Sequence, residues 1–178
     1  LNNMKKILKF FTILFFAIGT TDAQSKRNKK KADTETAKWN YTIECVGESN
    51  AGVYTLKVFS ILRDESLAGL QASKNAVHAV IFQGINGQGS KCAKNPPLAR
   101  SPFLEAEFEN YFKEFFASTE KEDLNSFSKY VNVIEVVTDR MKVSKKEYRI
   151  GTLLTVNIAL LRKTLEKEKI IKSLNSGF

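Results

Sequence analysis

The sequence predicts a single α+β domain, an antiparallel or mixed four-stranded sheet with helices packed on one face. Apolar and polar residues alternate in four segments, which is the period of a half-buried strand. Apolar residues recur every three or four positions in three other segments, which is the period of a helix. The segments follow the order β-β-α-α-β-β-α, and strand pairs separated by helices favour hairpins over a parallel sheet.

The first two strands are predicted to form a hairpin. Between residues 39 and 45, aromatic and apolar side chains alternate with polar ones, which indicates a strand with one buried face. Residues 47–52 begin and end with glycine and hold Ser49 and Asn50 between them, which is typical of a turn. Residues 53–62 are rich in β-branched and aromatic side chains and predict the second strand.

Two helices are predicted to follow. In the first, which begins at Asp64 and ends near Gly84, apolar residues recur at helical spacing and alanines form a flat second face suited to close packing on the sheet. Residues 84–100 carry glycines and prolines and predict a loop. The second helix is predicted to begin with Ser101 as N-cap and Pro102 at the first helical position, where its missing N–H does no harm.

The last third of the chain predicts a second strand pair and a final helix. A polar link over residues 119–128 leads to a strand at 130–138, a turn at 142–147 and a strand at 148–156. Asn157 is predicted to cap the final helix. Three apolar residues after that helix are expected to return to the core: Ile170, Ile171 and Leu174.

Residues 1–23 predict a secretory signal peptide. Met4 has the place of an initiator, lysines at positions 5, 6 and 9 follow it, and residues 10–18 are almost entirely apolar. Small residues at Thr21 and Ala23 fit a signal-peptidase site, so cleavage is predicted after Ala23. The apolar run is shorter than the roughly 20 residues that a membrane-spanning helix needs, which argues against a retained anchor.

Residues 24–37 predict a basic, disordered linker ahead of a folded domain at residues 38–178. The linker holds five basic residues: Lys26, Arg27, Lys29, Lys30 and Lys31. A segment this charged cannot bury enough apolar surface to offset the entropy lost on ordering. The domain is only mildly basic, with 20 Lys and Arg against 16 Asp and Glu, although the whole chain has a formal charge of +9. We expect weak contact of the linker with anionic lipid and no nucleic-acid partner.

Two cysteines, Cys45 and Cys92, remain after cleavage. An oxidising compartment permits a disulfide between them, and the loop that it closes is long enough for worthwhile stabilisation. The alternative is two unpaired buried thiols, because the sequence does not show whether the two Cα atoms come within bonding range.

The sequence predicts no catalytic, cofactor-binding or metal-binding residue. His78 is the one histidine, and no acidic residue stands four positions before or after it, so a metal site is not indicated. Pairing of His78 with Cys45 or Cys92 as a protease-like nucleophile lacks any local signature. The glycines of segment 84–89 follow a helix and open a proline-bearing loop, which is the wrong context for a phosphate-binding loop.

An aromatic set on the second predicted helix leaves two interpretations open. Its members are Phe103, Phe108, Tyr111, Phe112, Phe115 and Phe116. Their spacing favours a core-facing stripe. Because Phe103 and Phe116 lie off that stripe, their exposure would instead produce an apolar binding face for a partner or lipid.

Short packing patterns carry a family resemblance. They lie at residues 54–58 (YTLKV), 75–82 (NAVHAVIF), 156–157 (VN), 161–165 (LRKTL) and 170–174 (IIKSL). On these stretches the chain resembles a family of uncharacterised exported bacterial envelope proteins. More distantly it is similar to small envelope lipoproteins and to the amino-terminal domain of a flagellar-ring accessory protein, although it lacks the lipobox cysteine of the lipoproteins. The resemblance implies an accessory role in the periplasm or outer envelope and brings no catalytic residue.

The sequence leaves three classes of function open. The first is an exported cell-envelope accessory or interaction protein without catalytic activity or cofactor, bound to an envelope protein partner in the periplasm, at the outer envelope or outside the cell. The second is a carrier or sensor that binds an apolar small molecule or lipid against the Phe-rich helix. The third is an enzyme of unrecognised type, which would require polar groups with perturbed ionisation converging in a cleft.

Overall fold

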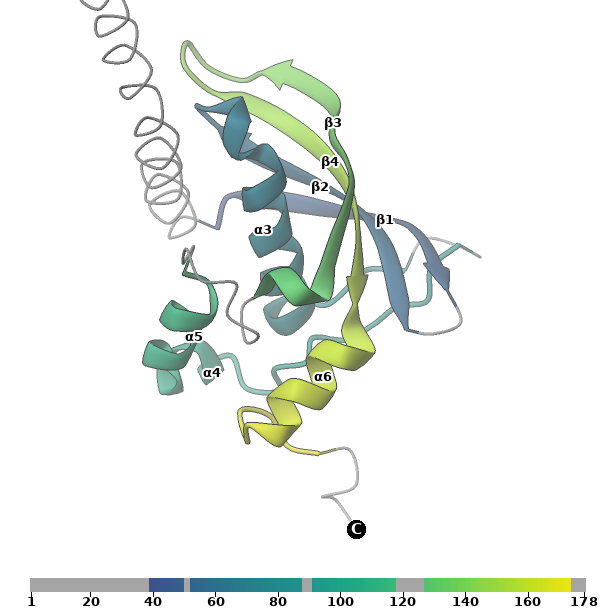
Figure 1. Ribbon diagram of the computed structural model, residues 1–178, viewed down its shortest axis with the longest axis vertical. Helices are drawn as coiled ribbons and strands as arrows, with labels where there is room; N and C mark the ends of the chain where they lie inside the picture. The colour runs from purple at the N-terminus through teal and green to yellow at the C-terminus, as the bar shows by residue number, and fades with distance from the viewer. Residues whose placement is uncertain (1–38, 50–51, 88–90, 118–126, 174–178) are drawn as a thin grey trace, which may run out of the picture.

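The computed structural model describes residues 39–49, 52–87, 91–117 and 127–173, so the predicted export signal and basic linker lie outside the described residues. Four strands form one antiparallel sheet in the order β1-β2-β4-β3 (Figure 1). Their bounds are Tyr41–Ser49 for β1, Val53–Leu62 for β2, Val131–Lys142 for β3 and Tyr148–Asn157 for β4. The predicted α+β class is therefore confirmed, with the sheet antiparallel throughout.

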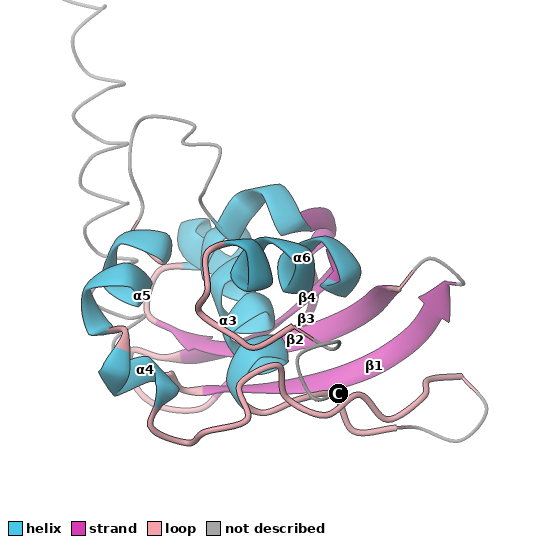
Figure 2. Cartoon of the chain, turned by 90° about the horizontal axis from the view of Figure 1, so that it is seen from below, coloured by secondary structure: helices cyan, strands magenta, loops and turns pink. Residues whose placement is uncertain are grey.

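The helical segments complete the fold. They are the 3-10 helices η1 (Glu65–Leu67) and η2 (Phe127–Tyr130) and the α-helices α3 (Ala68–Phe82), α4 (Leu104–Glu107), α5 (Glu109–Phe115) and α6 (Ile158–Lys167). Helix α3 lies against the curved sheet, and α4, α5 and α6 gather around its carboxyl-terminal end (Figures 1 and 2). In the part of the chain that the structure describes, no helix has the length and apolar character to cross a membrane.

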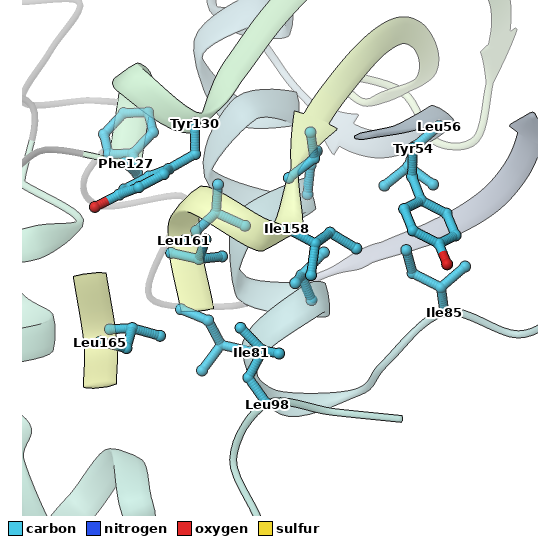
Figure 3. Packing of buried hydrophobic residues seen from close by; sticks show 14 of the residues in the cluster. Tyr54, Leu56, Ile81, Ile85, Leu98, Phe127, Tyr130, Ile158, Leu161 and Leu165 are labelled. Atoms are coloured by element: carbon cyan, nitrogen blue, oxygen red, sulfur yellow. The ribbon is translucent and has the colours of Figure 1, made fainter. Parts of the chain in front are cut away.

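The core lies between the sheet and the helices. The central strands β2 and β4 pair along their whole length, and their alternate side chains point toward α3; Leu56 and Leu154, which face each other in this register, are fully buried. Residues of α3 and α6 complete the same cluster, as Figure 3 shows for Ile81, Leu161 and Leu165. The alternating pattern of the sequence thus corresponds to a sheet with one buried face.

Helix α3 is buried on almost every side, because the sheet covers one face and the other helical segments cover much of the rest. Small residues such as Ala72 and Ala76 allow close approach to the sheet, as predicted. Its buried polar groups form a ladder in which Gln71 Nε2 donates to Asn75 Oδ1 at 3.0 Å and Asn75 Nδ2 donates to Ser60 Oγ at 2.8 Å. This ladder satisfies polar atoms that would otherwise destabilise the core.

The second predicted helix is broken in two, and its predicted start is wrong. The backbone leaves the α region at Phe108 (φ −116°, ψ 35°), which separates α4 from α5. Ser101 Oγ accepts the N–H of Phe103 in a local turn, and α4 begins only at Leu104. Helices this short depend on tertiary packing, and each piece buries its own apolar residues: Leu104 on α4 and Phe112 on α5.

Strand β3 begins one residue later and ends four residues later than predicted, and it lies at the edge of the sheet, paired with β4. Its pairing is irregular, because β3 advances from Glu135 to Asp139 while β4 advances only from Leu153 to Gly151. Such a bulge bends an edge strand and disrupts its hydrogen-bonding ladder. Strand β1 likewise extends beyond the predicted end at residue 45, with an irregularity between Cys45 and Gly47.

The final helix begins as predicted. The N–H of Leu160 donates to Asn157 Oδ1 at 2.9 Å, which caps α6. After α6, Lys169 adopts a left-handed conformation (φ 61°), and the Ile170 N–H donates to the Leu165 carbonyl at 2.9 Å. This C-terminal turn directs Ile170 and Ile171 back onto the core, whereas Leu174 lies outside the described residues.

A disulfide joins Cys45 on β1 to Cys92 in the loop after α3, with the two Cα atoms 6.2 Å apart. The loop is held against the end of α3 by paired backbone hydrogen bonds between Ile85 and Asn95. Gly84 is required where the loop leaves α3, since its φ is +76° and an added Cβ would lie 2.6 Å from the carbonyl oxygen of Asn95.

Candidate functional site

A groove of about 800 Å³ opens on the surface of the described residues. It lies between the segment 98–101, the α4–α5 break at Phe108, and the end of α6 with the turn that follows it. These segments gather at the end of the molecule that carries α4 and α6 (Figure 1). The groove is within the size range of sites that bind small organic molecules.

The floor of the groove is apolar. It is formed by residues that the main core already holds in place, with Phe108 half-buried and the rest buried: Leu98, Leu104, Phe108, Ile170 and Ile171. The floor is rigid because each residue belongs to the packed core on its other side. An apolar floor of this kind favours the burial of a hydrocarbon chain.

The rim of the groove is positively charged. Its acidic residues are Glu107 and Glu166. Its four basic residues are Arg100, Arg162, Lys169 and Lys172. Arg162 Nη1 lies 3.8 Å from Glu166 Oε1, one helical turn away, so this pair is largely self-neutralised. The remaining bases give the rim an excess of positive charge, which favours an anion.

The backbone itself contributes to the rim. The left-handed conformation of Lys169 is one that a residue with a side chain rarely adopts, and glycine is the usual residue at this position after a helix. A lysine there costs some stability but places a long basic side chain at the mouth of the groove. Strained positions of this kind are concentrated at functional sites.

A second group of polar side chains surrounds His78. The imidazole stacks on the Trp39 ring with centroids 3.6 Å apart, and its Nδ1 lies 2.6 Å from the hydroxyl oxygen of Tyr41. Its Nε2 lies 3.7 Å from Glu105 Oε1 and has no hydrogen-bond partner among the described residues. Glu105, although 27 positions away in sequence, supplies the acidic neighbour that helical spacing did not.

Burial governs the charge of this group. Desolvation lowers the pKa of His78 to about 3, so the ring is neutral at pH 7. Burial, with a smaller contribution from the charge of Glu105, raises the pKa of Tyr41, so its phenol stays protonated and donates to Nδ1. The proton of the neutral imidazole is then on Nε2, toward Glu105. The pKa of Glu105 is raised by its own partial burial, which a hydrogen bond from Trp39 partly offsets.

This arrangement connects the start of β1, α3 and α4 through a neutral histidine. A general base at neutral pH needs a pKa near 7, and the shift of His78 is in the opposite direction from that requirement. We therefore assign the histidine group a structural role. In the described part of the chain, no group of three His, Cys, Asp or Glu side chains is placed to hold a metal ion.

The structure divides the predicted aromatic set. Phe112, Phe115 and Phe116 are buried in the core, and Phe116 packs against Trp39 and Phe127. Phe103 is 70% exposed and stands apart from them. The set therefore does not form one binding face. Phe108 alone contributes to the groove, and Tyr111 instead donates its hydroxyl to Glu168 at 2.5 Å, just after α6.

Most groove residues were not identified from the sequence. Ile170 and Ile171 were expected to pack on the core, and the basic residues were indistinguishable from solvated surface charges. The mixture of lysines with isoleucines after α6 could have indicated a binding surface. The other half of the groove, at residues 98–108, lies more than 60 positions earlier, so the sequence does not connect the two segments.

No protein-family model matches the chain, and no curated protein or solved structure matches it either.

Proposed function

We propose that this protein is a non-catalytic binding domain whose groove holds an amphipathic anion, a molecule with a hydrocarbon chain and a carboxylate or phosphate head. The observation that carries the proposal is the combination of an apolar floor with a basic rim in one groove of about 800 Å³. This is the carrier or sensor class, with the groove at Phe108 in place of a face along the whole second helix.

The floor of the groove suits the hydrocarbon chain of such a ligand, and the rim suits its acidic head. Hydrocarbon buried on the floor contributes about 25 cal/mol for each Å² removed from water. An acidic head at the rim meets arginines and lysines, and hydrogen bonds to charged groups contribute about 1.5–3 kcal/mol each. Arg100 and Lys172 are both exposed and line the groove from two different segments of the chain, which suits them to hold the head.

The proposal includes export to the periplasm, the outer envelope or the exterior. The signal-peptide pattern of residues 1–23 is its main support. The disulfide between Cys45 and Cys92 agrees with it, because disulfides persist in oxidising compartments and are rare in the cytosol. The resemblance to envelope proteins remains a prediction from the sequence.

Calorimetric titration tests the ligand class. The chain from residue 24, purified with its disulfide intact, is titrated below micelle-forming concentrations with laurate, dodecyl phosphate and, as a chain-matched cation, dodecyltrimethylammonium. We expect one site for the anions and markedly weaker binding of the cation. Preference between laurate and dodecyl phosphate identifies the head group, and equal binding of anions and cation would refute the proposal.

A matched pair of variants tests the location. The double substitution Arg100→Gln/Lys172→Gln removes two rim charges and is expected to weaken anion binding about tenfold or more. Arg63→Gln/Lys91→Gln removes the same charge from exposed positions outside the groove and should leave affinity nearly unchanged. An equal loss in both variants would attribute binding to overall charge rather than to the groove.

A second candidate function is the accessory interaction module, which exposed apolar residues on the edge strand β3 favour. Ile134, Val136 and Val137 are all exposed there. Native mass spectrometry of the protein isolated mildly from the envelope separates the two functions. A stoichiometric protein partner without a small molecule would support the module, and a lipid-like molecule on a lone chain would support the carrier.

A further inference from the structure

The tip of the β3–β4 hairpin combines exposed aliphatic side chains with lysines. Residues 141–146, Met-Lys-Val-Ser-Lys-Lys, are all exposed. Met141 is 52% exposed and Val143 is 42% exposed, and three lysines accompany them. None of the six residues is acidic.

The tip is an ordered turn. The N–H groups of Val143 and Ser144 donate to the Glu147 carbonyl at 3.0 and 3.2 Å, and the strands pair up to Lys142 and Tyr148. The order matters because a preformed tip presents its side chains without the entropic cost of folding on contact.

The nearest acidic side chain is already paired. The Glu147 carboxylate accepts the Arg63 Nε–H at 3.3 Å, and Ser144 Oγ lies 3.2 Å from its other oxygen. Arg140, further along β3, pairs with Glu65 beside α3. The charge that the tip presents outward is therefore that of its three lysines: Lys142, Lys145 and Lys146.

The tip also lies far from the groove. The hairpin extends past the amino-terminal end of α3, whereas α4 and α6 lie near its other end (Figure 1). A Cβ added to Gly69, near the start of α3, would lie 3.6 Å from Val136 Cγ2, which agrees with this placement. A surface that binds the tip would leave the groove open to solvent.

We propose that the hairpin tip docks the protein on an anionic lipid bilayer, with Met141 and Val143 entering the headgroup boundary and the three lysines contacting lipid phosphates. Aliphatic side chains flanked by lysines are the composition of interfacial anchors. Protein surfaces that bind single-stranded nucleic acid use aromatic side chains for base stacking. Surfaces that bind the carboxylates of an acidic protein favour arginine, whose planar group makes two hydrogen bonds at once. The tip has neither aromatic residues nor arginine.

Vesicle sedimentation tests the docking. The chain from residue 24, with no added groove ligand, is mixed with phosphatidylcholine vesicles with or without about one third phosphatidylglycerol. Binding is expected only to the anionic vesicles. Because each basic residue near such a surface contributes roughly a fivefold factor, Lys142→Gln/Lys145→Gln/Lys146→Gln is expected to lower the partition coefficient on the order of 100-fold.

Two further variants isolate the contributions of charge and apolar contact. Lys91→Gln/Lys94→Gln/Lys113→Gln removes the same charge at other exposed positions and should lower partitioning far less. Met141→Ser/Val143→Ser should weaken binding about tenfold without changing its salt dependence, since it alters only apolar contact. All six lysines are exposed, and circular dichroism verifies that each variant is folded.

The outcomes separate this docking from other sources of binding. Equal losses in the two lysine variants, or no loss in either, would overturn the proposal and assign vesicle binding to residues 24–37 or to delocalised charge. The proposal would also be overturned if the triple lysine variant of the tip still bound vesicles but no longer bound an acidic protein from envelope extracts. Arg100→Gln/Lys172→Gln should keep vesicle binding, so that failure of the groove proposal and failure of this one are distinguishable.

Discussion

Lowering the pH from 7 to 5 is expected to destabilise the folded protein through His78. Its side chain is 7% exposed and stacked on Trp39, and its pKa is lowered from 6.5 to about 3 by desolvation. The unfolded chain therefore binds a proton at a higher pH than the folded one. The stability that depends on the neutral ring is fully present above pH 6.5 and is lost as the pH falls toward 3.

The magnitude follows from the two pKa values. At pH 7 both states are mostly unprotonated and the cost is small. At pH 5 the unfolded histidine is almost fully charged while the folded one is neutral, which lowers the free energy of unfolding by about 2 kcal/mol; at pH 4 the loss is about 3 kcal/mol. Losses of this size are a large fraction of the stability of an ordinary domain.

Urea unfolding at pH 7, 6 and 5 measures this effect, with His78→Asn as the reference. Asparagine offers an oxygen near the position of Nδ1 to accept from Tyr41 but binds no proton in this pH range. Both proteins share every other titrating group, so the difference between their free energies of unfolding isolates the histidine. That difference is expected to change by about 2 kcal/mol in favour of the variant between pH 7 and 5.

A pH-independent difference would refute the reasoning. A direct measurement sharpens the test, because NMR titration of the single imidazole gives its pKa in the folded protein. A value above 6.5 would show that the charge of Glu105, 3.7 Å from Nε2, outweighs burial. We expect the opposite, since Glu105 is 44% exposed and its attraction is weakened by solvent.

Variants of the disulfide, of Gly84 and of Asn157 test the fold. Replacing both Cys45 and Cys92 with serine opens a loop of 47 residues and is expected to cost about 4 kcal/mol of stability in urea unfolding; an unchanged midpoint would contradict the loop-closure argument. Gly84→Ala should cost about 2 kcal/mol or more, because its left-handed backbone leaves no room for a Cβ beside Asn95, and thermal melting that matches wild type would refute this. Asn157→Ala should cost about 1 kcal/mol through loss of the α6 cap, whereas Asn157→Asp should retain most of the stability.

The sequence by itself determined the fold class and most of the elements of this protein. Strand β2 and the cap of α6 at Asn157 were predicted correctly because their signals are local. Period-2 alternation and a side-chain cap depend on neighbours within a few positions, so no tertiary information is needed to interpret them. The same holds for the two hairpins, whereas the sequence left open an antiparallel or a mixed sheet, which the pairing of β2 with β4 decides.

Only the tertiary structure decided what the local pattern left open. The break at Phe108, the burial of Phe116 and the extension of β3 to Lys142 depend on which surfaces meet in space. The groove joins residues near position 100 to residues near position 170, and the acidic neighbour of His78 comes from another helix. Side chains acquire such neighbours through packing between distant segments, and periodicity along the chain carries no record of that packing.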